Sequence, residues 1–330
     1  MENVKYKYNQ HWKKDDYPTF TVVTPFFNRG YCLERVFKSV NSQTYREFEY
    51  IIVDDGSVEN NDPIVETFMT DVDFPVLYIK KENGGVHTAR NIAIKNSRGK
   101  YIVCIDSDDE LVPEALQMMT DVWLEIPKEI RNEFFEVKFR CLDAAGDNVG
   151  PEFPENLNSL PYKKRIRKYE SIQGEHIGVR RGDILRAHPW PEPDGVTFVT
   201  ENVLWCTLRR KYKSYFTNKI ARIYHTEVAD SISKKNSSYK TIKTIKNSYW
   251  NVAYYLNHSD IFYGIDKIPD YLRDVVRFLI FEHILSWRLG KHENYLKGVH
   301  NRVLAFVLWI PSILPAYIYA KKRMKGKQNE

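Results

Sequence analysis

The sequence predicts an α/β fold built on a largely parallel β-sheet. Between Thr19 and Asp109, short apolar runs rich in β-branched residues alternate with segments whose apolar residues recur at helical spacing. Strands that alternate with single helices form parallel sheets with helices packed on their faces. Polar residues directly follow three of the four runs, and ligands of such sheets bind at the carboxyl ends of the strands. The sequence therefore predicts both a sheet and the edge that carries its functional site.

Each element of this region has its own signal. The run Thr19–Thr24 (TFTVVT) predicts the first strand, and four apolar residues from Leu33 to Val40 recur at i, i+3, i+4 and i+7, which predicts a helix. The same reasoning predicts strands at 49–53, 76–80 and 100–105 and helices at 63–69 and 87–96. Beyond them we expect a helix after Pro113, strands at 134–140 and just before His225, and, after about residue 231, long helices at 239–256 and 271–289.

The segment 303–320 carries no charged residue over 18 positions and is followed by a cationic tail. Eighteen residues are at the lower limit for a membrane-spanning helix, and Pro311 and Pro315 would remove hydrogen bonds from its middle. We therefore expect segment 303–327 to lie at a membrane interface as a re-entrant or surface hairpin, with its cations on anionic headgroups. The alternative is a buried helix pair or a dimer contact, the latter in a homo-oligomer.

Charge and cysteine content exclude several classes of protein. The chain has 49 Lys and Arg against 43 Asp and Glu, a net charge of +6, and residues 302–330 alone contribute six basic side chains and one acid. Residues 15–110 hold 17 acids against 10 bases, a charge that repels nucleic-acid backbones, so we expect no nucleic-acid partner. The four cysteines form no CxxC pair and the first residues contain no apolar stretch, so we expect reduced thiols in a cytoplasmic protein.

Asp106-Ser107-Asp108 is the sharpest local signal for chemistry. It places two carboxylates directly after an apolar strand, where hard oxygen ligands suit Mg²⁺ or Mn²⁺ and the ion can bridge the phosphates of a nucleotide. Asp109 and Glu110 follow, and four acids within five residues are unfavourable unless a cation neutralises part of the charge. The alternative is a solvated acidic turn that caps the helix after Pro113.

Two further motifs follow strands. Asp54-Asp55-Gly56-Ser57 offers carboxylates that could accept hydrogen bonds from a base or a ribose, although taken alone it is equally an Asx turn. The glycine-rich stretch Asn83–Asn91 enters a helix, so its backbone N–H groups could approach phosphates and Arg90 could pair with one. It is neither a P-loop nor GxGxxG, and its alternative is a plain turn with a surface arginine.

Taken together, these motifs resemble the family 2 glycosyltransferases. The segments that carry the resemblance, in the order and spacing typical of that family, are Thr24–Arg29, Ser42–Thr44, Val53–Ser57, Asn83–Asn91 and Asp106–Asp109. The resemblance is dense over about 19–112, thin to about 230 and uninformative beyond. It implies a GT-A fold, a Rossmann-like mixed sheet flanked by helices. We expect a catalytic domain over 1–230, with a nucleotide-sugar half at 19–112 and an acceptor half at 113–230, and a helical extension over 231–330.

The resemblance also implies roles for individual residues. Those expected to border the UDP moiety and diphosphate of a UDP-sugar are Pro25, Asn28, Arg29, Asp54, Asp55, Gly84, Arg90, Asp106 and Ser107. Asp106 and Asp108 would hold the diphosphate through Mn²⁺ or Mg²⁺. His225 stands where related enzymes sometimes place a third metal ligand, although a lone histidine is more often structural. Segment 178–183 is expected on the acceptor side, as a solvated loop whose basic residues could meet a phosphate or an acidic sugar.

The catalytic base is the point at which this sequence departs from the family. The family usually inverts the anomeric centre with a carboxylate base, often in a Glu-Asp pair that opens a helix. The matching stretch here has Glu201, but Asn202 replaces the second acid, and an amide cannot accept the proton at neutral pH. Glu201 is the first candidate for the base, with Asp194 and Glu192 on the preceding loop as alternatives. Glu201 could instead be a helix N-terminal acid.

The sequence therefore predicts an inverting, metal-assisted enzyme of bacterial surface-polysaccharide or glycan assembly. It would transfer a sugar from a UDP-sugar to a hydroxyl of a glycan or lipid-linked glycan acceptor, as a peripheral or monotopic protein on the inner face of the cell membrane. The alternative is a catalytically weak relative that binds nucleotide and acts as a membrane scaffold, and Asn202 is its main support.

Overall fold

The computed structural model describes residues 4–161, 164–165, 168–169, 172–225, 241–258, 268–290 and 302–323. The chain divides into two compact units. The first comprises Met1–Pro189 and Leu208–Ser231, and the second comprises Trp190–Thr207 and Ile232–Glu330.

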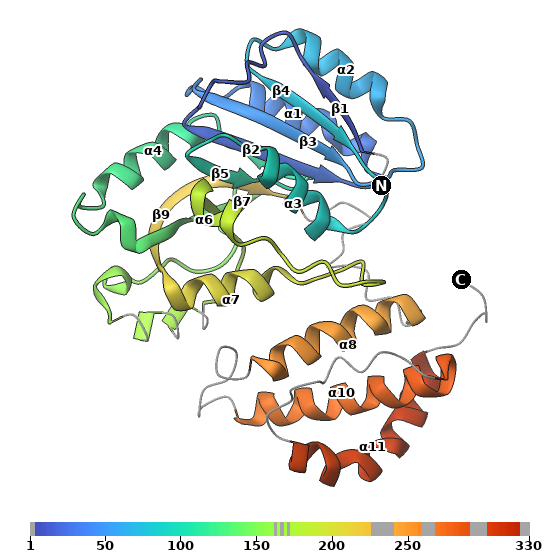
Figure 1. Ribbon diagram of the computed structural model, residues 1–330. Helices are drawn as coiled ribbons and strands as arrows, with labels where there is room; N and C mark the ends of the chain where they lie inside the picture. Colours follow the sequence, from blue (N-terminus) through green and yellow to red (C-terminus); the bar gives the residue numbers. More distant parts are fainter. Residues whose placement is uncertain are drawn as a thin grey trace. The chain divides into compact units, whose positions relative to one another are not determined.

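Nine strands of the described chain form one mixed sheet in the first unit, in the order β1-β4-β3-β2-β5-β8-β7-β9-β6 (Figure 1). Their bounds are β1 Lys5–Tyr8, β2 Phe20–Phe26, β3 Phe48–Asp54, β4 Val76–Lys80, β5 Tyr101–Cys104, β6 Glu110–Leu111, β7 Phe134–Asp143, β8 His176–Arg181 and β9 Lys213–Tyr224. The four predicted strands β2 to β5 are confirmed, and they run parallel to one another. Their carboxyl ends therefore share one edge of the sheet.

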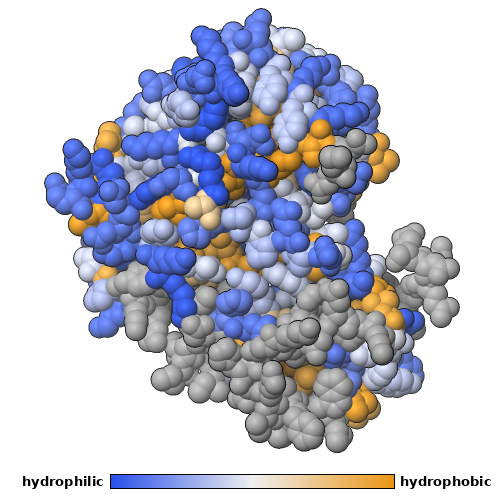
Figure 2. All heavy atoms as spheres, viewed as in Figure 1, coloured by the Kyte–Doolittle hydropathy of each residue, from blue (hydrophilic) through white to orange (hydrophobic). Residues whose placement is uncertain are grey.

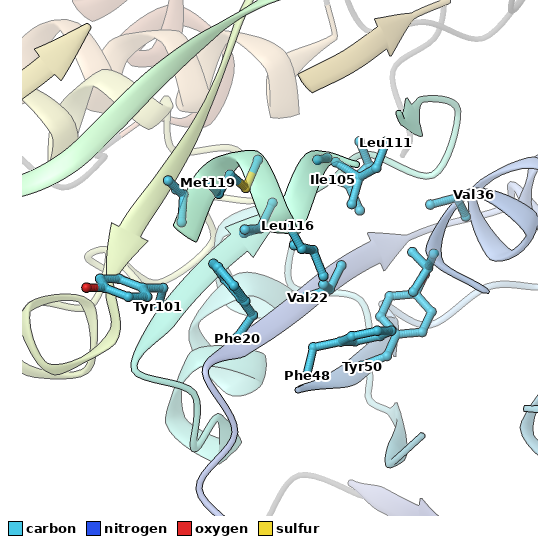
Figure 3. Packing of buried hydrophobic residues seen from close by; sticks show 14 of the residues in the cluster. Phe20, Val22, Val36, Phe48, Tyr50, Tyr101, Ile105, Leu111, Leu116 and Met119 are labelled. Carbon is cyan, nitrogen blue, oxygen red and sulfur yellow. The ribbon is translucent and has the colours of Figure 1, made fainter. Parts of the chain in front are cut away.

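The helices of this unit connect the strands and pack against the sheet to form the core. Their bounds are α1 Leu33–Asn41, α2 Asp62–Asp71, α3 Val86–Asn96, α4 Ala115–Glu125 and α6 Gly182–Ala187, and α7 Glu201–Lys211 crosses the division between the units. Alternate strand residues such as Phe20, Val22 and Tyr50 are buried with Val36 of α1 and Met119 of α4 (Figure 3). Burial of this many apolar side chains is the main force that holds the sheet and these helices together.

The segment 178–183, expected as a solvated loop, is instead part of the sheet. Gly178–Arg181 pairs with β5 on one side and β7 on the other, and α6 begins at Gly182. Arg180 is buried, because its guanidinium faces the fully buried Glu136 carboxylate at 3.3 Å. Basic residues and glycine suggested a loop, but pairing on both sides and a buried counter-charge stabilise a central strand.

The second unit contains α8 Ile242–Asn257, α10 Ile268–Leu289 and α11 Arg302–Arg323. Apolar residues of all three helices form one core, among them Tyr249, Phe278 and Ala316. The hairpin expected at 303–320 is wrong, because the helix continues through Pro311 and Pro315. Residues 324–327 of the expected interface segment lie outside the described part of the chain. None of the helices within the described ranges combines the length and hydropathy that crossing a bilayer requires.

Candidate active site

Asp55 is the buried centre of the turn that follows β3. Its carboxylate accepts hydrogen bonds from Lys81 Nζ at 2.9 Å and from the backbone N–H groups of Gly84 and Gly85 at 3.1 and 2.8 Å. Asp55 and Lys81 are both almost fully buried, so solvent ions screen this ion pair only weakly. The turn after β3 is thereby fixed to the glycine-rich loop after β4.

The loop after β2 is joined to the same turn. Asn28, in a left-handed conformation with φ of 53°, donates its backbone N–H to Ser57 Oγ at 2.9 Å and accepts the Val58 N–H on its side chain at 2.8 Å. The buried Asp54 accepts the Ser57 N–H at 2.7 Å. Gly56 has a φ of 78°, and a Cβ there would lie 2.6 Å from the backbone N of Asn83. The loops that follow β2, β3 and β4 therefore form one connected edge.

The acids at 106–110 are balanced by side chains from elsewhere in the chain. The closest pairs are Asp106 with Arg90 (3.0 Å), Asp108 with Arg29 (2.7 Å), Asp109 with Arg222 (3.1 Å) and Glu110 with His225 (2.7 Å). Positive charge that was expected to neutralise part of this cluster thus comes from three arginines of the chain itself, and Glu110 also contacts the His225 ring.

The members of this cluster differ in their exposure to solvent. The side chain of Asp106 is 47% exposed, whereas that of Asp109 is 2% exposed and also accepts the backbone N–H of His225 at 3.0 Å. Burial raises the pKa of Asp109 to about 7, although Arg222 lowers it. Asp109 thus ties the acidic loop to the end of β9, Asp106 is open to solvent, and Asp108 is largely buried beside Arg29.

Asp106 and Asp108 fit a divalent cation in part. Both offer carboxylate oxygens, the donors that Mg²⁺ and Mn²⁺ prefer, and Mg²⁺ is often held by one or two carboxylates with substrate phosphates completing its shell. Across the ranges that the structure describes, no three His, Cys, Asp or Glu side chains are grouped closely enough to hold a metal ion by themselves. His225 uses Nε2 to contact Glu110 Oε1, so its role as a third ligand stays a prediction.

Glu201 is the first residue of α7 and is exposed. Its Oε2 accepts a hydrogen bond at 3.1 Å from the indole Nε1 of Trp205, one turn along the same helix. Trp205 is buried edge-on against Trp190, with ring centroids 4.9 Å apart. Asp194, the alternative base, is exposed on the loop that precedes α7. Both carboxylates belong to the second unit, and the predicted donor-site residues belong to the first.

Sequence reasoning missed two residues that organise the site. Lys81 directly follows β4, so the rule that pointed to the other strand ends could also have found it. Arg222 gave no local signal, because its partners Asp109, Cys141 and Glu175 come from three other parts of the chain.

A buried histidine makes the first unit sensitive to acid. His87, on the first turn of α3, is 1% exposed, and neither ring nitrogen has a hydrogen-bond partner within the described part of the chain. Burial lowers its pKa to about 4; nearby Asp55 raises the pKa, and Lys81 and Arg90 lower it.

We therefore expect the free energy of unfolding to decrease as the pH falls below 6.5. Between pH 6.5 and 4 the unfolded chain binds a proton at His87 that the folded chain does not, so stability rises with pH in this window. At pH 5 the loss is on the order of 2 kcal/mol relative to pH 7. Urea unfolding of wild type and His87→Leu at pH 7 and pH 5 measures it, and an equal pH dependence in both proteins would contradict the assignment.

The carboxyl ends of the parallel strands β2 to β5 thus carry acids, arginines and a glycine-rich loop, groups that suit an enzyme acting on a nucleotide-linked substrate. Residues 21–131 match the family model described as Glycosyl transferase family 2. A Campylobacter jejuni protein, GalNAc(5)-diNAcBac-PP-undecaprenol beta-1,3-glucosyltransferase, is 26% identical over 238 residues, which cover 70% of each chain. The putative teichuronic acid biosynthesis glycosyltransferase TuaG of Bacillus subtilis is 32% identical over 116 residues, covering 35% of this chain and 44% of TuaG.

The fold has solved counterparts. The crystal structure of S. aureus TarS 1-349 in complex with UDP-GlcNAc superposes with a TM-score of 0.55 and 15% identity, covering 93% of both chains. The likeness confirms the GT-A fold. Over residues 21–131 the chain is similar to the family 2 glycosyltransferases, which transfer a glycosyl group from a nucleotide-sugar.

Proposed function

We propose that this enzyme uses a UDP-sugar and a divalent cation, and transfers the sugar with inversion to a hydroxyl of a surface glycan or lipid-linked glycan. The observation that carries the proposal is the pairing of Asp106 and Asp108 with Arg90 and Arg29 at the carboxyl edge of the sheet. Two acids for a cation and two arginines for phosphate oxygens are the groups that a nucleoside diphosphate needs. TarS with UDP-GlcNAc and the undecaprenol-linked name of the Campylobacter relative support the donor and acceptor classes.

In the proposed mechanism, residues of the first unit bind the donor. Asp106 and Asp108 would hold Mn²⁺ or Mg²⁺, and the ion would offset the charge on the departing UDP. Arg29 and Arg90 lie beside these carboxylates, where their guanidinium groups could bind phosphate oxygens of the donor. The carboxylate of Asp55 already accepts hydrogen bonds from Lys81, Asn83 and two backbone N–H groups, so it shapes the nucleotide site by holding the loop that it anchors.

On the acceptor side, Glu201 takes the proton from the attacking hydroxyl. A general base must present an ionisable oxygen, and Glu201 is an exposed carboxylate whose Oε2 accepts the Trp205 N–H. The hydroxyl attacks the anomeric carbon from the face opposite the departing UDP, which inverts the configuration at that carbon.

The proposed acceptor class agrees with an exposed apolar face on α11. Ile313, Leu314, Tyr317 and Ile318 are 40–65% exposed, whereas Ser312 and Ala316 on the other side of the helix are buried. Small residues face the core and large apolar residues face outward, with Lys321 and further cations next in the sequence. Figure 2 shows hydrophobic side chains exposed among the helices of the second unit. We propose that this face and the tail contact the inner surface of the cell membrane.

Replacing Leu314 and Ile318 by Ser should reduce binding to anionic lipid vesicles at least several-fold, because both side chains would leave the apolar interface. Co-sedimentation with vesicles of phosphatidylglycerol measures this. Equal sedimentation of wild type and the double variant would exclude α11 as the contact.

A donor screen tests the proposed function itself. Wild-type protein is heated with UDP-, GDP- and TDP-sugars, each with and without Mn²⁺ or Mg²⁺, and UDP release is followed in the presence of glycan acceptors. A ligand that binds only the folded state raises Tm, so a UDP-sugar with metal should give the largest shift. A larger shift with another nucleotide, or no dependence on metal, would overturn the donor or the metal assignment.

A further inference from the structure

The backbone directly before Glu201 is held by side chains of α8. Residues Thr197–Thr200 form neither helix nor strand. The Thr197 N–H donates to Asn247 Oδ1 at 2.9 Å, and the Thr200 N–H donates to Asn251 Oδ1 at 2.9 Å. This segment pairs with no strand, so these two backbone N–H groups obtain their acceptors from side chains of α8, much further along the chain.

The same two amides also donate back to the segment. Asn247 Nδ2 donates to Thr197 Oγ1 at 3.3 Å, and Asn251 Nδ2 donates to the carbonyl oxygen of Phe198 at 2.8 Å. Because each side chain uses its oxygen and its nitrogen on one short stretch, both the rotamer of the amide and the path of the backbone are fixed. A third contact, between Tyr255 OH and Thr200 Oγ1, lies one turn further along.

Asn247, Asn251 and Tyr255 are spaced at i, i+4 and i+8, so they form one stripe along α8. Asn247 and Asn251 are 9% and 5% exposed. Asparagine is a poor helix former, and a buried amide is unfavourable unless its groups are paired. Fold stability alone would be served by apolar residues at these positions, so the stripe points to a requirement for this particular backbone path.

That path leads directly into the candidate base. Glu201 follows Thr200 and opens α7, and its carboxylate is oriented by Trp205 Nε1. The backbone of the base is therefore set by α8 and its side chain is set by a buried indole, all within the second unit. Catalytic groups lose much of their effect when displaced by about 1 Å.

We propose that α8 is a positioning element for the general base, with Asn247 and Asn251 as positioning residues. The inference rests on the proposed function, which makes Glu201 the base. It gives the helical extension a part in catalysis that is separate from any contact with a membrane.

The test compares Asn251→Ala with Ser248→Ala, a control on the same helix that removes only an intrahelical hydrogen bond. For each folded protein, kcat, KM for the UDP-sugar, UDP affinity and the pH profile of kcat are measured. Asn251→Ala should lower kcat about tenfold or more and alter the acid limb of its pH profile, with donor KM and UDP affinity within twofold of wild type. A kcat equal to that of Ser248→Ala, or a loss shared equally by UDP affinity, would overturn the proposal.

Two further variants keep the outcome unambiguous. Tyr255→Phe removes one hydroxyl and leaves the ring, so it should fold and lower kcat about threefold if the stripe acts as a unit; an unchanged kcat would count against the proposal. Asn251→Asp keeps an oxygen for the Thr200 N–H and should recover part of the activity lost in Asn251→Ala. If Glu201→Gln keeps full activity, the proposed function is wrong. If Glu201→Gln is inactive but Asn251→Ala keeps the wild-type kcat, only the positioning role is wrong.

Discussion

Asp108→Ala is expected to lower glycosyl transfer by about a thousandfold or more. The change removes one of two carboxylates proposed to hold the cation, and loss of the cation removes several kcal/mol of stabilisation from the departing diphosphate. It also leaves Arg29 without the carboxylate that it faces at 2.7 Å. UDP release at saturating donor, measured over a range of Mn²⁺ concentrations, gives the effect on both rate and metal dependence.

The matched control is Asp121→Ala, which removes an exposed carboxylate from α4 whose described partner is Gln117 of the same helix. It should leave the rate within twofold of wild type. The Mn²⁺-dependent rise in Tm with UDP should disappear in Asp108→Ala and persist in Asp121→Ala. If Asp108→Ala retained both the rate and the metal-dependent rise, Asp106 and Asp108 would not be the metal site.

The polar edge of the sheet could be predicted from the sequence because its signals are local. Each motif directly follows a strand, and parallel strands bring their carboxyl ends to one edge whatever the intervening loops contain. Asp54, Asp55 and Asp106 were identified in this way. Their hydrogen-bond partners could not be predicted. The carboxylate of Asp55 bonds to Lys81 and to two backbone N–H groups, and these contacts depend on how two loops pack.

Features that depend on distant pairing left no such signal. The strand at 176–181 contains Gly178, Arg180 and Arg181, which resemble a surface loop until Glu136 of the neighbouring strand supplies the buried counter-charge. Likewise the prolines of α11 indicate a break by local rules, yet packing against α10 maintains the helix through them. The contacts between α8 and Thr197–Thr200 could not be inferred, because the resemblance to the family ends before α8 begins.

Glu201→Gln is expected to lower transfer about a hundredfold to ten-thousandfold, the usual contribution of a positioned general base. The amide has nearly the same shape and can still accept the Trp205 N–H through its oxygen, so the local structure should persist. The loss should appear in kcat, with donor KM and UDP affinity close to wild type, because the residues proposed to bind the donor belong to the other unit.

Asp194→Asn and Glu192→Gln are the decisive companions, because both remove an exposed carboxylate from the loop before α7. If Glu201 is the base, only Glu201→Gln loses the dependence of kcat on pH at the acid side. If Asp194→Asn shows that loss instead, the base lies on the loop and Glu201 is a helix N-terminal acid. If none of the three variants loses this pH dependence, none of the three carboxylates is the base. The replacement of the family's second acid by Asn202 then favours the catalytically weak alternative.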